Sequence, residues 1–447
     1  MSTKTKVEEA VDFIKKYAGD DGIPKINGKE WEEANKLFTK KEIKEAFAEY
    51  ISKYSVLFPF RDIPIEDVEK KFRELRAAPH IEFIMRDSGT VVEKYDDYKY
   101  PYSKYGKFVI SYGHYFNDIS NYFQQRNRYD CGSYGFVSPN EYWYSPDLLK
   151  RMNWTFWRME DQGINHNKIR SSFRLGAYVA TQFKPQVAKT IFDFVQTKIK
   201  KRQVHILDFS MGWGDRLAGF YTSRATHYLG TDPNPQTYRV YKQQCIEYER
   251  MISGRDPVIT DFQKEVNGHV YDAFKCIGYS GKEVIAYNAP AEDILDVIKS
   301  NQYDCIFTSP PYFATELYDE GGDDWKQSWF RYQEYDKWWN NFYSPVMKAC
   351  YESLADHGVM MINIMDPKVY GKRYNTCDQM VDYIQTLGGK FDGQIGMRYK
   401  QRPKDMDDPV KHKAYLTTTY IENVWCFSKN GFDLSPGFAT LEGLFGE

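Results

Sequence analysis

The chain has 447 residues, which is too long for one ordinary domain and predicts two. With 42% hydrophobic and 27% charged residues it has the composition of a folded globular protein, which excludes extensive disorder. The net charge of −2 excludes a global basic field, so any polyanion has to be held by a local basic surface.

The cysteines and histidines point away from disulfides and metals. The 7 cysteines are widely scattered without a CxxC pair, and the 8 histidines show no HxH or HExxH spacing. We therefore expect reduced thiols and no metal site. No stretch approaches the roughly 18 consecutive apolar residues of a membrane span, and the N-terminus lacks the apolar segment of a signal peptide. A cytoplasmic protein without a membrane partner is expected.

The first third of the chain differs in pattern from the rest. Apolar residues spaced by three and four predict helices over 7–18, 31–54 and 65–78. Residues 80–150 are dense in Tyr, Asn and Gly, so irregular structure with short strands is expected there. We place a boundary at 160, between a mainly helical, aromatic-rich domain (1–160) and a second domain (161–447).

The second domain alternates apolar strands with helical patterns. Strands are predicted over 204–210, 226–232, 282–288, 303–309, 357–364 and 421–429. Helices are predicted between them, over 183–200, 215–224, 233–252, 291–300, 338–354 and 377–388. This alternation predicts an α/β fold with a doubly wound, mostly parallel sheet. The carboxyl ends of its strands would share one edge, where such folds bind ligands.

A glycine turn follows the first of these strands, in the stretch Asp208-Phe-Ser-Met-Gly212-Trp-Gly214. Glycines at i and i+2 allow a sharp turn and a close approach of the backbone to a ligand. The stretch is not the GxGxxG dinucleotide fingerprint, because Leu217 stands at the third glycine position, and no Gly-Lys-Ser/Thr of a P-loop follows.

Acidic residues follow the next two strands. Asp232 ends the second strand, where a carboxylate accepts hydrogen bonds from ribose hydroxyls, although it also suits a helix N-cap. Glu292 and Asp293 follow the third strand and also suit the first turn of a helix. A ribose pocket without a phosphate loop favours a nucleoside-type cofactor over NAD or ATP.

The fourth strand runs into Ser309-Pro310-Pro311-Tyr312. Proline lacks an N–H, has a fixed φ and keeps the preceding residue out of the helical region, so this stretch is stiff and extended. It is either a simple strand terminator or a rigid platform for a ligand.

The order FKPQVAK, LDFSMGWGDRL, YLGTDPNP and FTSPPY, within residues 166–430, resembles S-adenosylmethionine-dependent amino-methyltransferases of nucleic acids. The resemblance implies a class I methyltransferase fold, which is Rossmann-like with a seven-stranded-type sheet. With serine in its first position, the tetrapeptide resembles that of the enzymes that methylate cytosine N4. An aspartate in that position is more usual in the enzymes that methylate adenine N6.

The resemblance also implies site residues. The catalytic tetrapeptide would be Ser309, Pro310, Pro311 and Tyr312. The residues binding S-adenosylmethionine would be Phe183, Pro185, Asp208, Ser210, Gly212, Gly214, Asp232, Glu292, Asp293 and Thr308. The chain departs from the family at Trp213 and Asp215, where small or hydroxyl residues are commoner. The third strand also lacks an obvious aspartate for the adenine amine, which leaves Glu292 and Asp293 as substitutes.

The tetrapeptide suits amine methylation chemically. The lone pair of an exocyclic base amine is delocalised into the ring, so the amine is a poor nucleophile. Two acceptors, Ser309 Oγ and the Pro310 carbonyl, would localise that lone pair, and the prolines would hold both rigidly. Tyr312 would stack on a base swung out of its helix.

Two regions are candidates for holding a polynucleotide. The N-terminal domain offers aromatic and basic side chains for stacking and phosphate contacts. The segment 397–415 is interpreted as a basic loop, with Arg398, Lys400, Arg402 and Lys404 as nucleic-acid-binding candidates, or else as a plain solvated loop. Trp338 and Trp339 are expected in a core helix.

The leading hypothesis is a site-specific DNA amino-methyltransferase acting on cytosine N4 of a flipped base, as in restriction-modification. The alternatives are adenine N6 of DNA or RNA, a protein amide, and an inactive cofactor-binding scaffold that acts as a nucleic-acid-binding module. DNA is the expected partner, with RNA less favoured.

Overall fold

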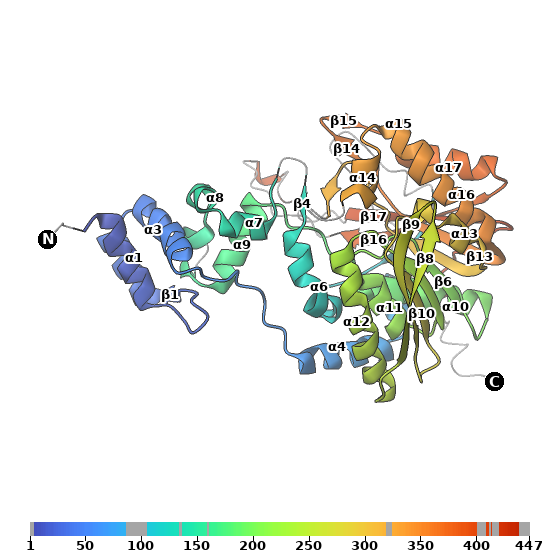
Figure 1. The fold of residues 1–447 in the computed structure, drawn as a ribbon, viewed down its shortest axis with the longest axis horizontal. Helices are drawn as coiled ribbons and strands as arrows, with labels where there is room; N and C mark the ends of the chain where they lie inside the picture. The colour runs from blue at the N-terminus through green and yellow to red at the C-terminus, as the bar shows by residue number, and fades with distance from the viewer. Residues whose placement is uncertain are drawn as a thin grey trace. The chain divides into compact units, whose positions relative to one another are not determined.

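The computed structural model describes residues 4–85, 105–133, 136–158, 161–318, 324–399, 408–410, 413 and 420–437. The chain forms two compact units. Unit 1 consists of residues 1–62, 125–181 and 316–320, and unit 2 of residues 63–124, 182–315 and 321–447. Figure 1 gives the labels of the elements.

Unit 1 is mainly helical, as expected for the N-terminal part. Its helices are α1 (Lys6–Lys16), α2 (Gly28–Leu37), α3 (Lys40–Lys53), α7 (Pro139–Tyr144), α8 (Pro146–Arg151) and α9 (His166–Gly176), with the 3-10 turn η3 (Thr155–Trp157). Its short strands pair as β1 (Ile26–Asn27) with β5 (Gly163–Ile164), and β12 (Glu316–Leu317) with β4 (Gly132–Ser133). Capping boxes start α1 at Thr5 and α3 at Thr39.

The aromatic residues of unit 1 form its core. Trp31, Phe47, Trp143, Trp154 and Phe156 are all buried there. Their rings pack edge to face or stacked, with Trp154 and Phe156 centroids 4.9 Å apart. These aromatic side chains therefore stabilise unit 1 from its core rather than lying on its surface.

The compact units divide the chain differently from the expected boundary at 160. Residues 63–124 belong to unit 2, because the helix α4 (Ile65–Ala77) buries Phe72 and Leu75 in the core around the large sheet. Residues 161–181 belong to unit 1, because Ile169 and Phe173 of α9 are buried in the core of unit 1.

The region 80–150 contains helices that the sequence pattern did not predict, because α6 (Asp118–Asp130), α7 and most of α8 lie in it. α6 lies within the stretch expected to be irregular. Its buried side chains are mostly polar, among them Ser120, Asn121, Gln124 and Gln125. These amides and hydroxyls form specific hydrogen bonds, such as that from Gln124 to the Thr237 carbonyl at 3.2 Å, so no apolar periodicity marks the helix.

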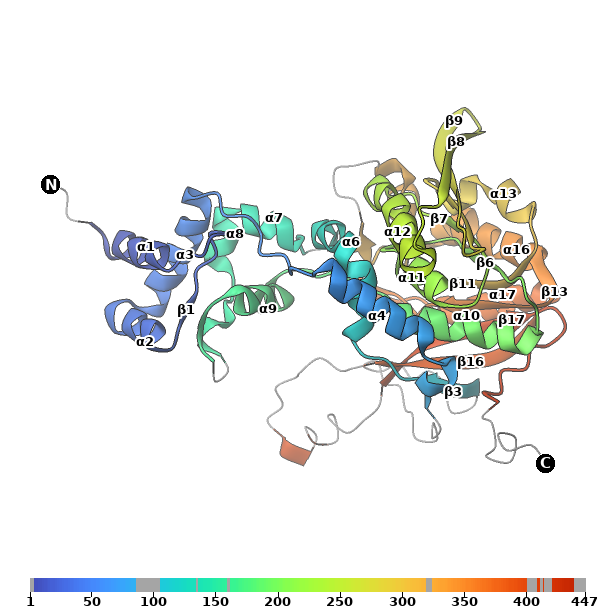
Figure 2. The same ribbon diagram turned by 90° about the horizontal axis from the view of Figure 1, so that it is seen from below.

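Unit 2 is built on an eleven-stranded sheet with the order β2-β3-β16-β17-β13-β11-β6-β7-β10-β9-β8. Figure 2 shows this sheet from below, with the β8–β9 hairpin projecting from it. The strands are β2 (Ile84–Met85), β3 (Gly106–Ile110), β6 (His205–Asp208), β7 (His227–Thr231), β8 (Val258–Val266), β9 (His269–Ile277), β10 (Glu283–Tyr287), β11 (Tyr303–Thr308), β13 (Leu354–Asn363), β16 (Lys390–Tyr399) and β17 (Tyr420–Ser428). A further hairpin joins β14 (Lys368–Val369) to β15 (Lys372–Arg373).

The fold class is α/β, as predicted, but the sheet has eleven strands rather than seven. Five neighbouring strands, β10, β7, β6, β11 and β13, are parallel, and β17 and β16 continue the sheet antiparallel. These seven strands form the expected centre. The hairpin β8–β9 extends one edge, and β3 and β2 extend the other.

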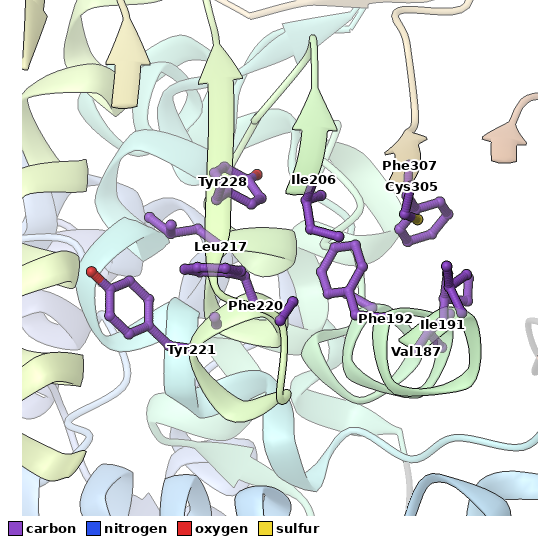
Figure 3. Close-up of a cluster of buried hydrophobic side chains, with 14 of the residues drawn as sticks. Val187, Ile191, Phe192, Ile206, Leu217, Phe220, Tyr221, Tyr228, Cys305 and Phe307 are labelled. Carbon is purple, nitrogen blue, oxygen red and sulfur yellow. The ribbon is translucent and has the colours of Figure 1, made fainter. Parts of the chain in front are cut away.

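Helices cover both faces of the sheet, which is the doubly wound arrangement. On one face, α10 (Pro185–Ile199), α11 (Asp215–Thr222) and α12 (Pro235–Ser253) bury their apolar sides. Figure 3 shows Ile206, Tyr228 and Phe307 of the strands facing Phe192 of α10 and Phe220 of α11.

The other face is covered by α13 (Leu295–Lys299), α16 (Ser344–Ser353) and α17 (Thr376–Thr386). Between β11 and α16 lie η5 (Asp324–Lys326), α14 (Ser328–Arg331), α15 (Tyr335–Trp338) and the π-helix η6 (Trp339–Tyr343). Trp338 and Trp339 are buried, which confirms their expected place in the core. The remaining turns of unit 2 are η1 (His80–Phe83), η2 (Tyr115–Asn117) and η4 (Ala291–Asp293).

Two further findings concern the chain as a whole. All seven cysteines are buried and none is in a disulfide. Among the described residues, no helix has both the length and the apolar character needed to cross a membrane.

Candidate active site

The loop between β6 and α11 carries the predicted glycines. Gly212 and Gly214 have φ angles of +55° and +69°, which residues with a side chain rarely adopt. A Cβ at Gly214 would lie 2.4 Å from the Gln244 side chain, whereas a Cβ at Gly212 would meet only the Ser210 carbonyl oxygen, at 3.9 Å. Gly214 therefore permits packing inside the protein, and Gly212 leaves space for a ligand to approach the backbone.

Asp208 is fully buried at the end of β6 and links four elements. Its Oδ2 accepts hydrogen bonds from Arg216 Nε at 2.8 Å and from the Tyr228 hydroxyl at 2.6 Å, and its Oδ1 accepts one from Thr308 Oγ1 at 2.9 Å. These donors come from α11, β7 and β11. Asp208 and Thr308 thus join the strand ends beneath the glycine loop, with their polar groups directed at each other.

The other residues predicted next to the cofactor lie around this framework. Phe183 is half-buried, with its ring 5.6 Å from that of Phe307 on β11 and 5.2 Å from the guanidinium of Arg216. Pro185 is buried as the first residue of α10. Ser210 is half-buried, and its N–H donates to Asp208 at 3.3 Å.

Asp232 directly follows β7 and supports the glycine loop. Its Oδ2 accepts a hydrogen bond from the Gly212 N–H at 2.7 Å, and its Oδ1 accepts one from the Asn234 N–H at 3.0 Å. The alternative role of Asp232 as a helix N-cap is wrong, because Asn234 caps α12. Burial raises the pKa of Asp232 to about 6 despite these hydrogen bonds.

Glu292 and Asp293 share a cation that the sequence pattern did not indicate. Arg331 donates to Glu292 Oε1 at 2.8 Å and to Asp293 Oδ1 at 2.9 Å. Asp293 also accepts a hydrogen bond from the Tyr271 hydroxyl. Burial raises the pKa of Glu292 to about 7, and the charge of Arg331 opposes that rise. The two acids are therefore held by the segment that follows the tetrapeptide.

The tetrapeptide follows directly on β11, which ends at Thr308. Pro310 is buried, and Ser309, Pro311 and Tyr312 are half-buried. The Ser309 Oγ lies 3.5 Å from the Tyr312 hydroxyl. The buried residue after the tetrapeptide, Phe313, has a φ of +46°, so the chain turns sharply there.

The Tyr312 side chain is anchored through its hydroxyl. This group donates to a Glu422 carboxylate oxygen at 2.9 Å, and it also lies 3.3 Å from the Asn363 carbonyl oxygen. Asn363 ends β13, and Glu422 lies near the start of β17. Because β17 runs antiparallel to β13, its amino end lies at the same edge as the carboxyl ends of the parallel strands.

Glu422 is half-buried and was not predicted. One signal for it existed in the sequence: a Glu-Asn pair opens an otherwise apolar last strand.

Of the four basic residues predicted to bind nucleic acid, the structure describes Arg398. Arg398 is exposed on β16, which runs to Tyr399, so the start of the expected basic loop is a strand. Lys400, Arg402 and Lys404 lie outside the described residues.

The tetrapeptide, Asn363 and Glu422 all lie in one stretch of the chain that matches a family model. Residues 303–436 match the N6_N4_Mtase family model of DNA methylases. This match supports an amino-methyltransferase family, methyl transfer as the reaction and S-adenosylmethionine as the cofactor. It also suggests a nucleic-acid substrate. No curated protein matches the chain.

Similar solved structures include three methyltransferases. One is the S-adenosylmethionine-dependent methyltransferase from Agrobacterium tumefaciens, at 12% identity and a TM-score of 0.32, over 57% of this chain and 64% of that one. Another is the precorrin-6y C5,15-methyltransferase from Geobacter metallireducens, at 11% identity and a TM-score of 0.28, over 56% and 92%. The third is a putative RNA methyltransferase from Pyrococcus horikoshii, at 9% identity and a TM-score of 0.28, over 55% and 83%. The strand order of the sheet alone establishes the α/β fold of this chain.

The residues at this edge fit S-adenosylmethionine. A ligand can approach the backbone at Gly212, where a Cβ would meet only the Ser210 carbonyl oxygen, at 3.9 Å. Asp232 Oδ1 accepts the Asn234 N–H and, at 3.4 Å, the Thr237 hydroxyl, whereas Oδ2 accepts the Gly212 N–H, so Oδ2 keeps a lone pair for a ribose hydroxyl. Asp208 and Thr308 end β6 and β11 at this edge and are joined by a hydrogen bond.

Proposed function

We propose that the chain transfers the methyl group of S-adenosylmethionine to an exocyclic amino group of a flipped-out DNA base, with cytosine N4 favoured. The observation that carries this proposal is the position of Ser309-Pro310-Pro311-Tyr312, which directly follows β11 inside the stretch that matches DNA methylases. The neighbouring strands β6 and β7 bring the glycine loop and Asp232 to the same edge.

Gly212 and Asp232 would hold the cofactor through the backbone approach and the ribose hydroxyls. When bound, S-adenosylmethionine supplies an activated methyl group on a sulfonium. Phe183 and Pro185 would border its methionine or adenine part, and Ser210 and Gly214 would shape the loop around it. Glu292 and Asp293 remain the candidates for the adenine amine, although both are paired with Arg331.

Ser309 and Pro310 would act on the target amine. The Ser309 hydroxyl oxygen and the Pro310 carbonyl oxygen accept its two N–H bonds, which localises the nitrogen lone pair for in-line attack on the methyl group. Pro310 is buried and Pro311 half-buried, so these acceptors are held in place before the substrate binds. Tyr312 is half-buried, which leaves part of its ring for stacking on the base.

The proposal is tested by incubating the chain with labelled S-adenosylmethionine and DNA, and then analysing the nucleosides by mass spectrometry. We expect N4-methylcytosine, strongly reduced by Ser309→Ala and unchanged by Ser300→Ala. Ser300 is an exposed serine on the segment before β11 and serves as the matched control. N6-methyladenine in place of N4-methylcytosine would move the target to adenine.

Binding of the cofactor is measured separately by calorimetry. Absence of both modified nucleosides from wild-type reactions, together with normal cofactor binding, would leave RNA, a protein amide or an inactive nucleic-acid-binding scaffold. Failure to bind S-adenosylmethionine would overturn the proposed reaction as a whole.

A further inference from the structure

Three arginines of unit 1 lie on two helices that contact the same segment, residues 59–61. Arg126 lies on α6, and Arg170 and Arg174 lie one turn apart on α9. The Arg126 guanidinium is 5.1 Å from the Phe60 ring centroid. Arg170 Nη1 donates to the Pro59 carbonyl at 3.1 Å and approaches the Phe60 carbonyl at 3.5 Å. We name Arg126, Arg170 and Arg174 the arginine cluster.

Residues 59–61, which the arginine cluster contacts, are held by hydrogen bonds from both α6 and α9. The Gln125 side chain of α6 donates to the Arg61 carbonyl at 2.8 Å and accepts from the Arg61 N–H at 3.1 Å. Arg170 of α9 holds the two preceding carbonyls. The chain at Phe60 is therefore held by side chains of both helices that carry the arginine cluster. These hydrogen bonds fix the helices and their arginines to one segment.

The arginine cluster is not paired with acids in the part of the chain that the structure describes. Among the described residues, no carboxylate forms an ion pair with Arg126, Arg170 or Arg174, whereas Arg216 and Arg331 are each paired with acids. Burial lowers the pKa of Arg170; the nearby Tyr129 hydroxyl opposes this shift, and the positive charges of Arg61 and Arg174 add to it. Arg126 and Arg174 are exposed, so an anion from solution can reach them.

Guanidinium groups that contact one short segment, and that have no acidic partner among the described residues, suit phosphate groups. Each presents a planar fork of N–H donors that matches phosphate oxygens, and like charges at fixed spacing are relieved when an anion binds between them. An arginine lying over an aromatic ring, as Arg126 lies over Phe60, keeps the edge of its guanidinium available for such contacts.

We propose that the arginine cluster of unit 1 binds phosphate groups of the DNA backbone. This inference rests on the proposed function, because it names the surface by which the same substrate is held. Backbone contacts position a duplex without reading its sequence, so the cluster would supply affinity and register rather than choice of base.

The test compares two double variants of the full chain. Arg126→Gln/Arg174→Gln removes the two exposed arginines of the cluster and spares Arg170, which holds the backbone. Lys150→Gln/Arg151→Gln removes the same charge from the last turn of α8 in the same unit. Binding of a fluorescent DNA duplex is followed by anisotropy at several salt concentrations, and binding of S-adenosylmethionine is measured by calorimetry.

We expect the cluster variant to bind DNA roughly a hundredfold more weakly at about 0.1 M salt, with the slope of log K against log salt reduced by about two. The control variant is expected to resemble the wild type, and cofactor affinity is expected to be equal in all three proteins. A melting temperature equal to that of the wild type would show that the cluster variant is folded, because its substitutions lie in unit 1 and the proposed cofactor residues in unit 2.

Two results would overturn the inference. One is a wild-type salt slope in the cluster variant, and the other is an equal loss of DNA affinity in both double variants. Its failure is distinct from failure of the proposed function. A wild-type protein that methylates DNA while the cluster variant binds DNA normally contradicts only the inference. A protein that binds DNA through the cluster yet methylates no base contradicts only the proposed reaction.

Discussion

The Tyr312 hydroxyl donates a hydrogen bond of 2.9 Å to Glu422, which lies 110 residues further along the chain. This bond joins the residue expected to stack on the base to the first residues of the last strand, so the ring is oriented from its far end. A hydrogen bond to a charged acceptor contributes about 1.5–3 kcal/mol, enough to influence the position of an aromatic ring.

Tyr312→Phe removes this bond and keeps the ring. We expect kcat for DNA methylation to fall by about tenfold, because the ring loses its anchor, while the Kd for S-adenosylmethionine stays unchanged. Tyr312→Ala should cost more, since it also removes stacking. Glu422→Gln keeps an acceptor and should retain more activity than Glu422→Ala. Equal kcat values for Tyr312→Phe and wild type would contradict the anchoring role.

Cofactor affinity should depend on pH through Asp232. Its pKa is raised by burial to about 6, so the carboxylate is ionised at pH 7.5 and largely protonated at pH 5. Ribose hydroxyls donate to the ionised form, so the Kd for S-adenosylmethionine should rise as the pH falls through 6.

Asp215, with a pKa of about 6, and Glu292, with a pKa of about 7, titrate in the same pH range. The same calorimetric titration of Asp232→Asn therefore separates the contribution of Asp232 from theirs. The variant should bind more weakly at pH 7.5 and show a flatter pH profile. A wild-type Kd that is the same at pH 5 and 7.5 would refute the role of the Asp232 carboxylate.

Arg331 should be needed for stability. Arg331→Met leaves Glu292 and Asp293 without their cation, and breaking a buried ion pair typically costs about 3–5 kcal/mol, with the lower end expected because Arg331 is partly exposed. The loss should be larger at pH 8 than at pH 6. The pKa of Glu292, already about 7 with the arginine present, rises further without it.

The direction of this pH dependence follows from the linkage between protonation and folding. A carboxyl whose folded pKa lies above its unfolded value favours folding at low pH, and this contribution is lost as the pH rises through the folded pKa. Urea unfolding at the two pH values measures the effect. Glu292→Gln added to Arg331→Met should restore part of the stability at pH 8, and equal losses at both pH values would contradict the pairing.

Alanine substitutions at Gly212 and Gly214 should have different effects, one on cofactor binding and the other on stability. Alanine at either position adopts a positive φ and costs about 1–2 kcal/mol. Gly214→Ala also overlaps the Gln244 side chain and should lower the melting temperature further. Gly212→Ala should be the milder change for stability and should weaken S-adenosylmethionine binding. The reverse order in melting temperature would show that the space at Gly212 is not open.

Much of the α/β unit was predictable because its strands are apolar runs bounded by turn residues. β16 was missed because Gly393 and Gly396 interrupt its apolar pattern, and Gly393 lies at a bulge with a φ of +124°. The long hairpin β8–β9 was missed as structure because many of its side chains are exposed, so its apolar alternation is weak.

The candidate site was predictable only in part. Asp208, Asp232 and Ser309 follow strands directly, so a parallel sheet brings them to one edge. Arg331 and Glu422 come from segments whose approach depends on the packing of the whole unit, and a single sequence carries only weak signals of that packing.

Each unit is made of three separate segments of the chain. One crossing from unit 2 to unit 1 lies between Thr315 and Glu316, only three residues beyond Tyr312. No single cut in the polypeptide can therefore release one unit intact from the other. Deletion mapping, including removal of residues 1–160, would disrupt both units at once. The contributions of substrate binding and of methyl transfer have to be separated by point substitutions in the intact chain.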